Sequence, residues 1–384
     1  MLDFRKLSTY WSELLGEAAK GQVLQTEHVA LAEETLAQHS SEFEKLCAKC
    51  TDPASRLTWL IGLPLSDPKE SFPLPKFDPA YKVVASDGSG FPLSRHQALA
   101  VYLINIGLVA LTYGEQAQAS LSSTPELFFK DADLSIGEKA HKRPITSGEI
   151  DLKRDLRELQ ALQKFVDREA ADLVLVDGSL VRWQLPGDGS QFEKEYLRDY
   201  IANFTALQKA RVPIAAYISL SGSSEGVNFL RLALCPYEPP NCDRCPDLPC
   251  NKIAGVLDRM LFGKQLKPGE RTCLFASRSK ILQAYGEHQI FFFYLNVGSE
   301  IARVEIPRYV AEDEKLLNQV HALLWDQVSK GHGYPIALQE AHEQAVVGNS
   351  ERELFFATIE RELMKNGQKI KQTAKSLSKR QRIV

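Results

Sequence analysis

The sequence predicts an α/β protein in which a mixed β-sheet is flanked by helices and preceded by an N-terminal helical region. Three observations favour this class. Residues 1–60 carry apolar side chains at loosely helical spacing, strands crowd together between residues 81 and 113, and helices alternate with strands from residue 148 onwards. Consecutive strands followed by such alternation are typical of a mixed sheet with helices on its faces. The 384 residues, 44% of them hydrophobic, are enough for one large domain with additions or for two domains.

The elements are expected in the following order. The N-terminal helices end before a proline-rich linker at residues 64–79, so residues 1–75 form a first segment, residues 80–350 the main domain, and residues 351–384 a helix end with a basic tail. The strands are expected at residues 81–86, 98–105, 107–113, 127–129, 172–176, 212–219, 272–276, 289–297 and 302–306. The helices are expected at residues 148–171, 192–210, 253–262, 312–329 and 336–364, and the Gly/Ser-rich stretch at 222–226 is expected to be a mobile loop.

Composition narrows the classes of function. Lys and Arg number 46 and Asp and Glu number 49, so the net charge of −3 gives no global sign of a polyanionic partner. The first residues lack the apolar core of a signal peptide, and the longest apolar run, at residues 98–112, is too short to span a bilayer. The seven cysteines are clustered and do not resemble a disulfide framework, so we expect a cytoplasmic protein without a membrane partner. The absence of a Gly-x-x-x-x-Gly-Lys-Ser/Thr loop argues against an ATP-driven motor.

Two strands end in the same tripeptide. The strand at 81–86 is followed by Asp87-Gly88-Ser89, and the strand at 172–176 by Asp177-Gly178-Ser179. A carboxylate at the end of a buried strand must be solvated, paired or bound to metal, and glycine allows the chain to turn sharply there. The repetition therefore indicates two carboxylates at one edge of one sheet, an arrangement that suits a divalent cation in phosphodiester chemistry. Strand-Asp-Gly is also an ordinary turn signal, which is the alternative.

Three further side chains are candidates for the same site. Glu158 lies in the helix that leads into the Asp177 strand and could bring a third carboxylate to the metal, although Asp155 is a rival on that helix and a solvated position is the simpler interpretation. His342 lies about two turns into the last predicted helix and could bind metal or move a proton. Tyr334, eight residues earlier, could hold a phosphate or orient a carboxylate. Both His342 and Tyr334 could instead be structural.

A cysteine cluster and a basic tail stand apart from these motifs. Four thiols within 16 residues could surround one Zn²⁺ ion or an iron–sulfur cluster, with free thiols or a redox pair as the alternatives: Cys235, Cys242, Cys245 and Cys250. The pair Cys47 and Cys50 is left unassigned. Residues 365–384 contain no acid and form either a solvated end or a segment that holds phosphates, with candidate DNA contacts at Lys371, Lys375, Lys379, Arg380 and Arg382.

Taken in order, five motifs resemble those of the NurA nuclease family. They are Asp87 in ASDGSG, Glu158, Asp177 in LVDGSL, Tyr334 in GYP and His342 in EAHE, and the resemblance spans roughly residues 80–350. It implies an RNase-H-like core and a metal-dependent deoxyribonuclease, a 5′–3′ exonuclease and single-strand endonuclease that processes DNA ends in double-strand break repair. It also implies a homodimer with a hexameric HerA-type ATPase as partner. The cysteine cluster and the basic tail depart from the family pattern.

On that resemblance, the five motif residues have expected roles. Asp87, Asp177 and Glu158 would hold Mn²⁺, with Mg²⁺ as the alternative. His342 would add a ligand or move a proton, and Tyr334 would position a phosphate or a ligand. Two rival classes of function remain: a DNA-binding or scaffold subunit with a degenerate site, and a metal- or redox-sensing protein that acts through the cysteine cluster.

Overall fold

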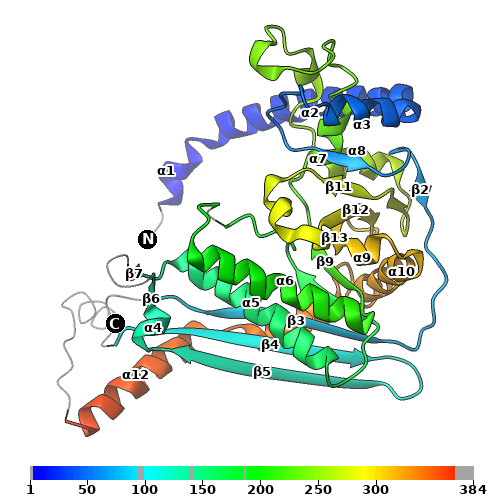
Figure 1. Ribbon diagram of the computed structural model, residues 1–384. Helices are drawn as coiled ribbons and strands as arrows, with labels where there is room; N and C mark the ends of the chain where they lie inside the picture. Colours follow the sequence, from blue (N-terminus) through cyan, green and yellow to red (C-terminus); the bar gives the residue numbers. More distant parts are fainter. Residues whose placement is uncertain (1–2, 94–98, 138–141, 186, 368–384) are drawn as a thin grey trace. The chain divides into compact units, whose positions relative to one another are not determined.

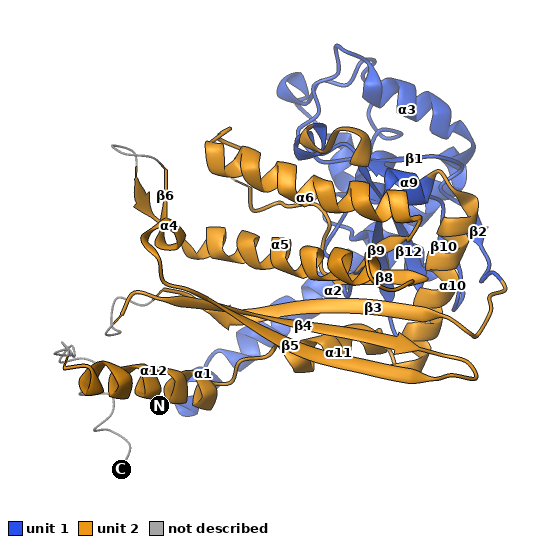
Figure 2. Ribbon diagram, turned by 60° about the horizontal axis from the view of Figure 1, so that its bottom comes forward, with its two compact units in different colours: residues 1–75, 217–283, 289–311 blue, residues 76–216, 284–288, 312–384 orange. Residues whose placement is uncertain are grey.

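The computed structural model describes residues 3–93, 99–137, 142–185 and 187–367, and they form two compact units (Figure 1). The first unit comprises residues 1–75, 217–283 and 289–311, and the second comprises residues 76–216, 284–288 and 312–384 (Figure 2). The N-terminal residues thus share a compact unit with segments from the middle of the chain. The domain boundaries expected from the sequence stay a prediction.

The second unit is built on a mixed sheet. Strands β3 (Lys82–Phe91), β4 (Tyr102–Thr112) and β5 (Gln118–Phe128) are antiparallel neighbours, and β8 (Leu173–Asp177) runs parallel to β3 on its other side. Strand β9 (Ile214–Ile218), which begins in this unit, lies beside β8. The order β9-β8-β3-β4-β5, with three antiparallel strands and β8 added parallel to β3, is that of an RNase-H-like fold. The predicted fold class is therefore confirmed.

Helices cover both faces of this sheet (Figure 2). Helix α5 (Ser147–Val166) lies on one face, where the Ser86 hydroxyl donates a hydrogen bond to the carbonyl oxygen of Glu158. Helix α11 (Ile336–Ala345) lies on the other face and packs closely against Gly107, where a Cβ atom would lie 2.3 Å from the carbonyl oxygen of Ala341. The other helices of this unit are α4 (Asp131–Leu134), α6 (Gln191–Ala210), α10 (Glu314–Lys330) and α12 (Asn349–Lys365). The small strands β6 (Ser135–Ile136) and β7 (Arg143–Pro144) pair with each other.

Three local predictions were wrong. The strands expected at residues 98–105 and 107–113 are one strand, β4, with Gly107 in its middle. The missing side chain of Gly107 makes room for α11. Strand β5 was expected only near its end, since it is a polar, solvent-exposed edge strand without the hydrophobic alternation that reveals buried strands. The helix expected at residues 336–364 is two helices, α11 and α12, separated at residues 346–348.

The first unit joins helices to a second group of strands. Its strands are β1 (Gly62–Pro64), β2 (Ser71–Phe72), β10 (Arg271–Thr272), β11 (Phe275–Ser277), β12 (Ile290–Asn296) and β13 (Ile301–Pro307). Its α-helices are α1 (Phe4–Ser8), α2 (Trp11–His39), α3 (Phe43–Thr51), α7 (Glu225–Leu230), α8 (Asp258–Gln265) and α9 (Arg308–Ala311). Short 3₁₀-helices span Ser40–Glu42, Cys242–Arg244 and Pro249–Ile253, and another, Lys280–His288, begins in this unit and ends in the second. Its core includes the aromatic rings of Phe262, Phe275, Phe292 and Tyr294, which are in mutual contact. Within the described ranges, no helix is both long and apolar enough to cross a membrane.

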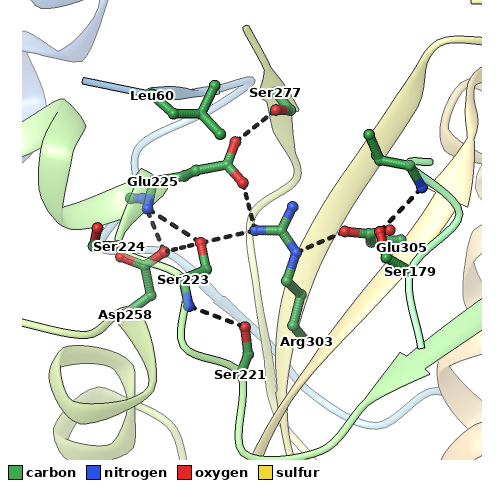
Figure 3. Close-up of polar contacts among 12 residues, drawn as sticks. Leu60, Ser179, Ser221, Ser223, Ser224, Glu225, Asp258, Ser277, Arg303 and Glu305 are labelled. Carbon is green, nitrogen blue, oxygen red and sulfur yellow. Dashed lines mark hydrogen bonds and ion pairs between the residues drawn. The ribbon is translucent and has the colours of Figure 1, made fainter. Parts of the chain in front are cut away.

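A network of polar contacts holds the Gly/Ser-rich segment of the first unit (Figure 3). The Ser223 hydroxyl accepts from Arg303 and donates to Asp258, and Asp258 accepts from the backbone N–H groups of Gly226 and Val227. Glu225 forms an ion pair with Arg303 at 2.8 Å. The segment expected to be a mobile loop at 222–226 is thus held by residues of β13 and α8, and its last two residues, Glu225 and Gly226, begin helix α7, a difference that the Gly/Ser-rich composition did not reveal.

Candidate active site

Asp87 and His342 meet across the α11 face of the sheet in the second unit. Asp87 lies in β3, one residue beyond Ser86, the last β3 residue that pairs with β8. His342 lies in α11, and its Nδ1 is 2.7 Å from Oδ2 of Asp87. The His342 side chain is 62% exposed and that of Asp87 is 19% exposed. The imidazole is therefore fixed by a carboxylate through one nitrogen while much of the ring faces solvent.

Asp177 and Tyr334 form a second pair. Asp177 is the last residue of β8, directly after Val176, which pairs with Ser86 of β3, so the two Asp-Gly-Ser motifs begin side by side. The Tyr334 side chain forms a hydrogen bond with the Asp177 carboxylate. Tyr334 lies just before the start of α11, the helix that carries His342. One segment, residues 334–342, thus contacts both Asp87 and Asp177.

Glu158 approaches from the opposite face, carried by α5. It is buried, and its Oε1 lies 3.4 Å from Nε of Arg154. A Cβ atom on Gly88 would lie 2.4 Å from that same Oε1 and 2.5 Å from Cγ of Arg154. Strand β8 ends beside Asp87, so beyond Ser86 the described residues give β3 no strand partner on that side. We call this side the open flank of β3. Carboxylates from both faces of the sheet can approach each other around it.

The two glycines of the repeated motif serve different purposes. Gly178 has a φ of +81°, the left-handed conformation that glycine adopts without strain. Gly88 continues the strand, and its missing side chain makes room for Glu158 and Arg154. The sequence-based interpretation of a sharp turn therefore holds for Gly178 and was wrong for Gly88.

A cation-rich shell beside Glu158 was missed by the sequence analysis. Asp155 forms ion pairs with Arg154 and with the almost fully buried Arg182. Arg154 also pairs with Asp151 at 3.2 Å. Two rival carboxylates on α5 were considered. Asp155 is held by two guanidinium groups, whereas Glu158 lies against the Asp87-Gly88 segment. The only sequence signal was the run of alternating charges in α5, which is also typical of a solvated helix face.

The electrostatics of the three carboxylates follow from this crowding. Burial, reinforced by Asp155 and Asp87, raises the pKa of Glu158 to about 8, although Arg154 and Arg182 oppose the shift. Desolvation and the charge of Asp87 raise the pKa of Asp177, while the hydrogen bond from Tyr334 opposes this. Ionised carboxylates that repel one another and are poorly hydrated gain most from a nearby cation.

The donor chemistry of this centre fits a divalent metal ion. Its oxygen ligands suit Mn²⁺ or Mg²⁺, hard or nearly hard cations that prefer carboxylates. As the side chains lie, each carboxylate is held by its own neighbour: Asp87 by His342, Asp177 by Tyr334 and Glu158 by Arg154. No three His, Cys, Asp or Glu side chains of the described residues converge as a ready-made metal cluster. Binding of an ion would thus require small side-chain adjustments that exchange these partners for metal.

The cysteine cluster does not form the metal site considered from the sequence. Cys235, Cys242, Cys245 and Cys250 are free thiols, and the same absence of a converging ligand group among the described residues applies to them. The expectation of Zn²⁺ or an iron–sulfur cluster is therefore not supported. The candidate DNA contacts at Lys371, Lys375, Lys379, Arg380 and Arg382 lie outside the described residues.

The fold and the site together define a class: an RNase-H-like α/β protein with a centre of three carboxylates, one His and one Tyr. A family model for the NurA domain matches residues 81–347. This match covers more than half of the chain, and the protein belongs to the NurA family of nucleases.

Comparison with solved structures agrees with the fold. The NurA nuclease from Sulfolobus solfataricus aligns with a TM-score of 0.54 at 14% identity, covering 95% of this chain and 98% of the other. A NurA structure with manganese aligns with a TM-score of 0.36 at 12% identity, covering 76% and 90% of the two chains. One bound to dAMP and manganese aligns with a TM-score of 0.33 at 12% identity, covering 73% and 88%. No curated protein matches the chain.

Proposed function

We propose that this protein is a metal-dependent deoxyribonuclease whose active site is formed by Asp87, Glu158, Asp177, Tyr334 and His342. The observation that carries the proposal is the approach of three carboxylates from two parallel strands and a helix around the open flank of β3, with His342 bonded to one and Tyr334 to another. Membership of the NurA family supports the same reaction class.

Asp87, Asp177 and Glu158 would hold Mn²⁺, or Mg²⁺ in its place. When bound, the ion would lower the pKa of a water molecule and offset negative charge on the scissile phosphate. The carboxylates themselves would fix the position of the ion, because two of them stand on adjacent parallel strands whose register is set by backbone hydrogen bonds. Arg154 would limit the excess negative charge at Glu158 and so allow an anionic phosphate to approach.

His342 and Tyr334 would act through hydrogen bonds. With Nδ1 against Asp87, the ring is oriented so that Nε2 can exchange a proton with the nucleophilic water or the leaving oxygen. A role for His342 as a further metal ligand would require this bond to break. Tyr334 would keep the Asp177 carboxylate in the orientation needed for the metal, because a hydrogen bond to a metal-binding carboxylate limits its rotation.

The finer assignments belong to the same proposal. The protein would act as a 5′–3′ exonuclease and single-strand endonuclease on DNA ends in double-strand break repair, as a cytoplasmic homodimer with a HerA-type hexameric ATPase.

The basic residues beyond 367 would add phosphate contacts. Removing the chain after Met364 should then weaken DNA binding and reduce its salt dependence. An unchanged salt slope would remove the tail from the proposal.

The proposal is tested by degradation of end-labelled single- and double-stranded DNA in EDTA, Mg²⁺ or Mn²⁺, with Asp87→Asn beside the wild type. We expect cleavage only with a divalent ion and only in the wild type. Labelling each end separately reads the polarity. A folded Asp87→Asn protein that cuts at the wild-type rate would overturn the site assignment, and wild-type protein inactive with every metal, alone and with a HerA-type ATPase added, would overturn the function.

A further inference from the structure

Gln327, a fully buried residue of α10, makes hydrogen bonds at both ends of its side-chain amide. Its Nε2 donates to the hydroxyl of Tyr81 at 2.8 Å and to that of Tyr113 at 3.1 Å. Its Oε1 accepts from the backbone N–H of Ala337 at 3.2 Å. The amide therefore connects the residue that precedes β3 and the residue that follows β4 to the first turn of α11, the helix that carries His342.

The orientation of this amide is determined by its partners. The Tyr81 hydroxyl donates its own hydrogen to Asp326, so it can only accept from Gln327. Burial raises the pKa values of both Tyr81 and Tyr113, and the two rings remain protonated. The nitrogen of Gln327 must consequently face the tyrosines, which leaves its oxygen to face Ala337.

Helix α11 depends on this contact because it lacks a capping side chain of its own. Pro335 occupies the N-cap position and makes no side-chain hydrogen bond. The first N–H groups of a helix have no partner within the helix, and an external acceptor stabilises them. The preceding turn is also anchored at this point, since the N–H of Gly331 donates to the carbonyl oxygen of Gln327 and that of Gly333 to the carbonyl oxygen of Val328.

The consequence concerns the candidate active site. Tyr334 lies two residues before α11 begins and His342 lies in its second turn, so both depend on where that helix starts. We propose that Gln327 is a positioning residue that sets the start of α11 and thereby orients Tyr334 and His342 toward Asp177 and Asp87. Its effect on catalysis rests on the proposed nuclease function, whereas its effect on the geometry of His342 does not.

The test compares Gln327→Met, which removes both ends of the contact at similar volume, with Gln319→Met on the same helix. Gln319, which is half-buried, is a control for loss of a glutamine hydrogen bond on this helix, because its Nε2 donates to the carbonyl oxygen of Asp172 at 2.6 Å. For Gln327→Met we expect kcat to fall about 10- to 100-fold with KM for DNA little changed, as is typical when the support of a site residue is removed. Gln319→Met should keep the wild-type kcat.

Nuclear magnetic resonance gives a second readout that needs no turnover. The ring nitrogen signals of ¹⁵N-labelled His342 report the bond to Asp87, and we expect them to change in Gln327→Met but not in Gln319→Met. If Gln327→Met does not fold, Gln327→Asn keeps a buried amide that is too short to span both partners, and the same changes are expected.

Unchanged His342 signals and unchanged kcat in a folded Gln327 variant would overturn the proposal. Equal losses in the Gln327 and Gln319 variants would also overturn it, since they would indicate a general loss of stability. If the wild type does not cleave DNA, the His342 signals still decide the positioning role, so failure of the nuclease function and failure of this inference are distinguishable.

Discussion

The two compact units each contain a cluster of carboxylates, and the clusters differ in burial and in how their charge is compensated. In the first unit, Arg303 forms ion pairs with Glu225 at 2.8 Å and with Glu305 at 2.9 Å, and all three side chains are almost completely buried. Asp258, beside them, accepts from two backbone N–H groups and from Tyr294. In the second unit, Asp87 lies within β3 and Asp177 at the end of β8, both partly open to solvent, and their partners are an imidazole and a phenol.

The difference separates a structural role from a functional one. The first cluster satisfies its charges with a permanent guanidinium and with backbone donors, so an added ion would have little to gain. In the second cluster Glu158 also has a guanidinium partner, Arg154, but the partners of Asp87 and Asp177 are an imidazole and a phenol, and these two carboxylates keep a route to solvent. A site that binds a metal ion and a phosphate requires carboxylates whose negative charge is not yet balanced.

The largest expected effect follows from replacing a strand-end carboxylate. Asp177→Asn should lower the rate of DNA cleavage by about 10³-fold or more, because a ligand that stabilises charge in the transition state is lost. Its melting temperature should not fall, since Asp177 is solvent-exposed and asparagine has nearly the same shape. Cleavage assays and thermal unfolding measure the two quantities. A strongly destabilised variant would place Asp177 with the structural cluster instead.

The opposite result is expected for the cluster of the first unit. Arg303→Met leaves Glu225 and Glu305 buried without their partner and should cost about 3–5 kcal/mol of unfolding free energy. Cleavage per folded molecule should remain close to wild type. Urea unfolding and activity at a temperature where the variant is folded check both parts. Loss of cleavage without loss of stability would contradict the separation.

The pH dependence of stability sharpens the description of the first cluster. Burial raises the pKa of Asp258 to about 6, above its ordinary value near ~4. A carboxyl group whose pKa is raised by folding stabilises the protein at low pH and loses that contribution as the pH rises through the folded value. The stability of wild type relative to Asp258→Asn should therefore decline between pH ~4 and ~6, by about 3 kcal/mol at most. Urea unfolding at several pH values measures the difference, and a difference that rises over this range would show that the sign is wrong.

The smallest effects on cleavage and stability are expected when the two glycines of the repeated motif are replaced. Gly88→Ala places a methyl group against Glu158 and Arg154 and should reduce cleavage about 10- to 100-fold by displacing the carboxylate. Gly178→Ala meets no atom within 4 Å, but its φ of +81° is unfavourable for alanine, so it should cost about 1 kcal/mol of stability and spare most activity. Equal activity of the two variants would contradict the account of Gly88.

The sequence predicted the neighbouring positions of Asp87 and Asp177 because their signal is local. Both follow short apolar runs in strands that lie adjacent and parallel, although β3 does not end at Asp87 but continues to Phe91. The fold class could be predicted for the same reason. The sequence did not reveal the partners of these residues, such as the Arg154–Asp155–Arg182 group or Gln327, because pairing across long separations leaves no periodic pattern. The polar edge strand β5 and the close approach at Gly107 were missed on similar grounds.

The central claim is that the uncompensated carboxylates of the second unit, and not the compensated ones of the first, bind the metal ion. Calorimetric titration of metal-free protein with Mn²⁺ tests it most directly, using wild type, Asp177→Asn and Glu305→Gln. We predict binding that is lost or weakened at least about tenfold in Asp177→Asn and is retained in Glu305→Gln. Wild-type Mn²⁺ affinity in a folded Asp177→Asn protein would contradict the account.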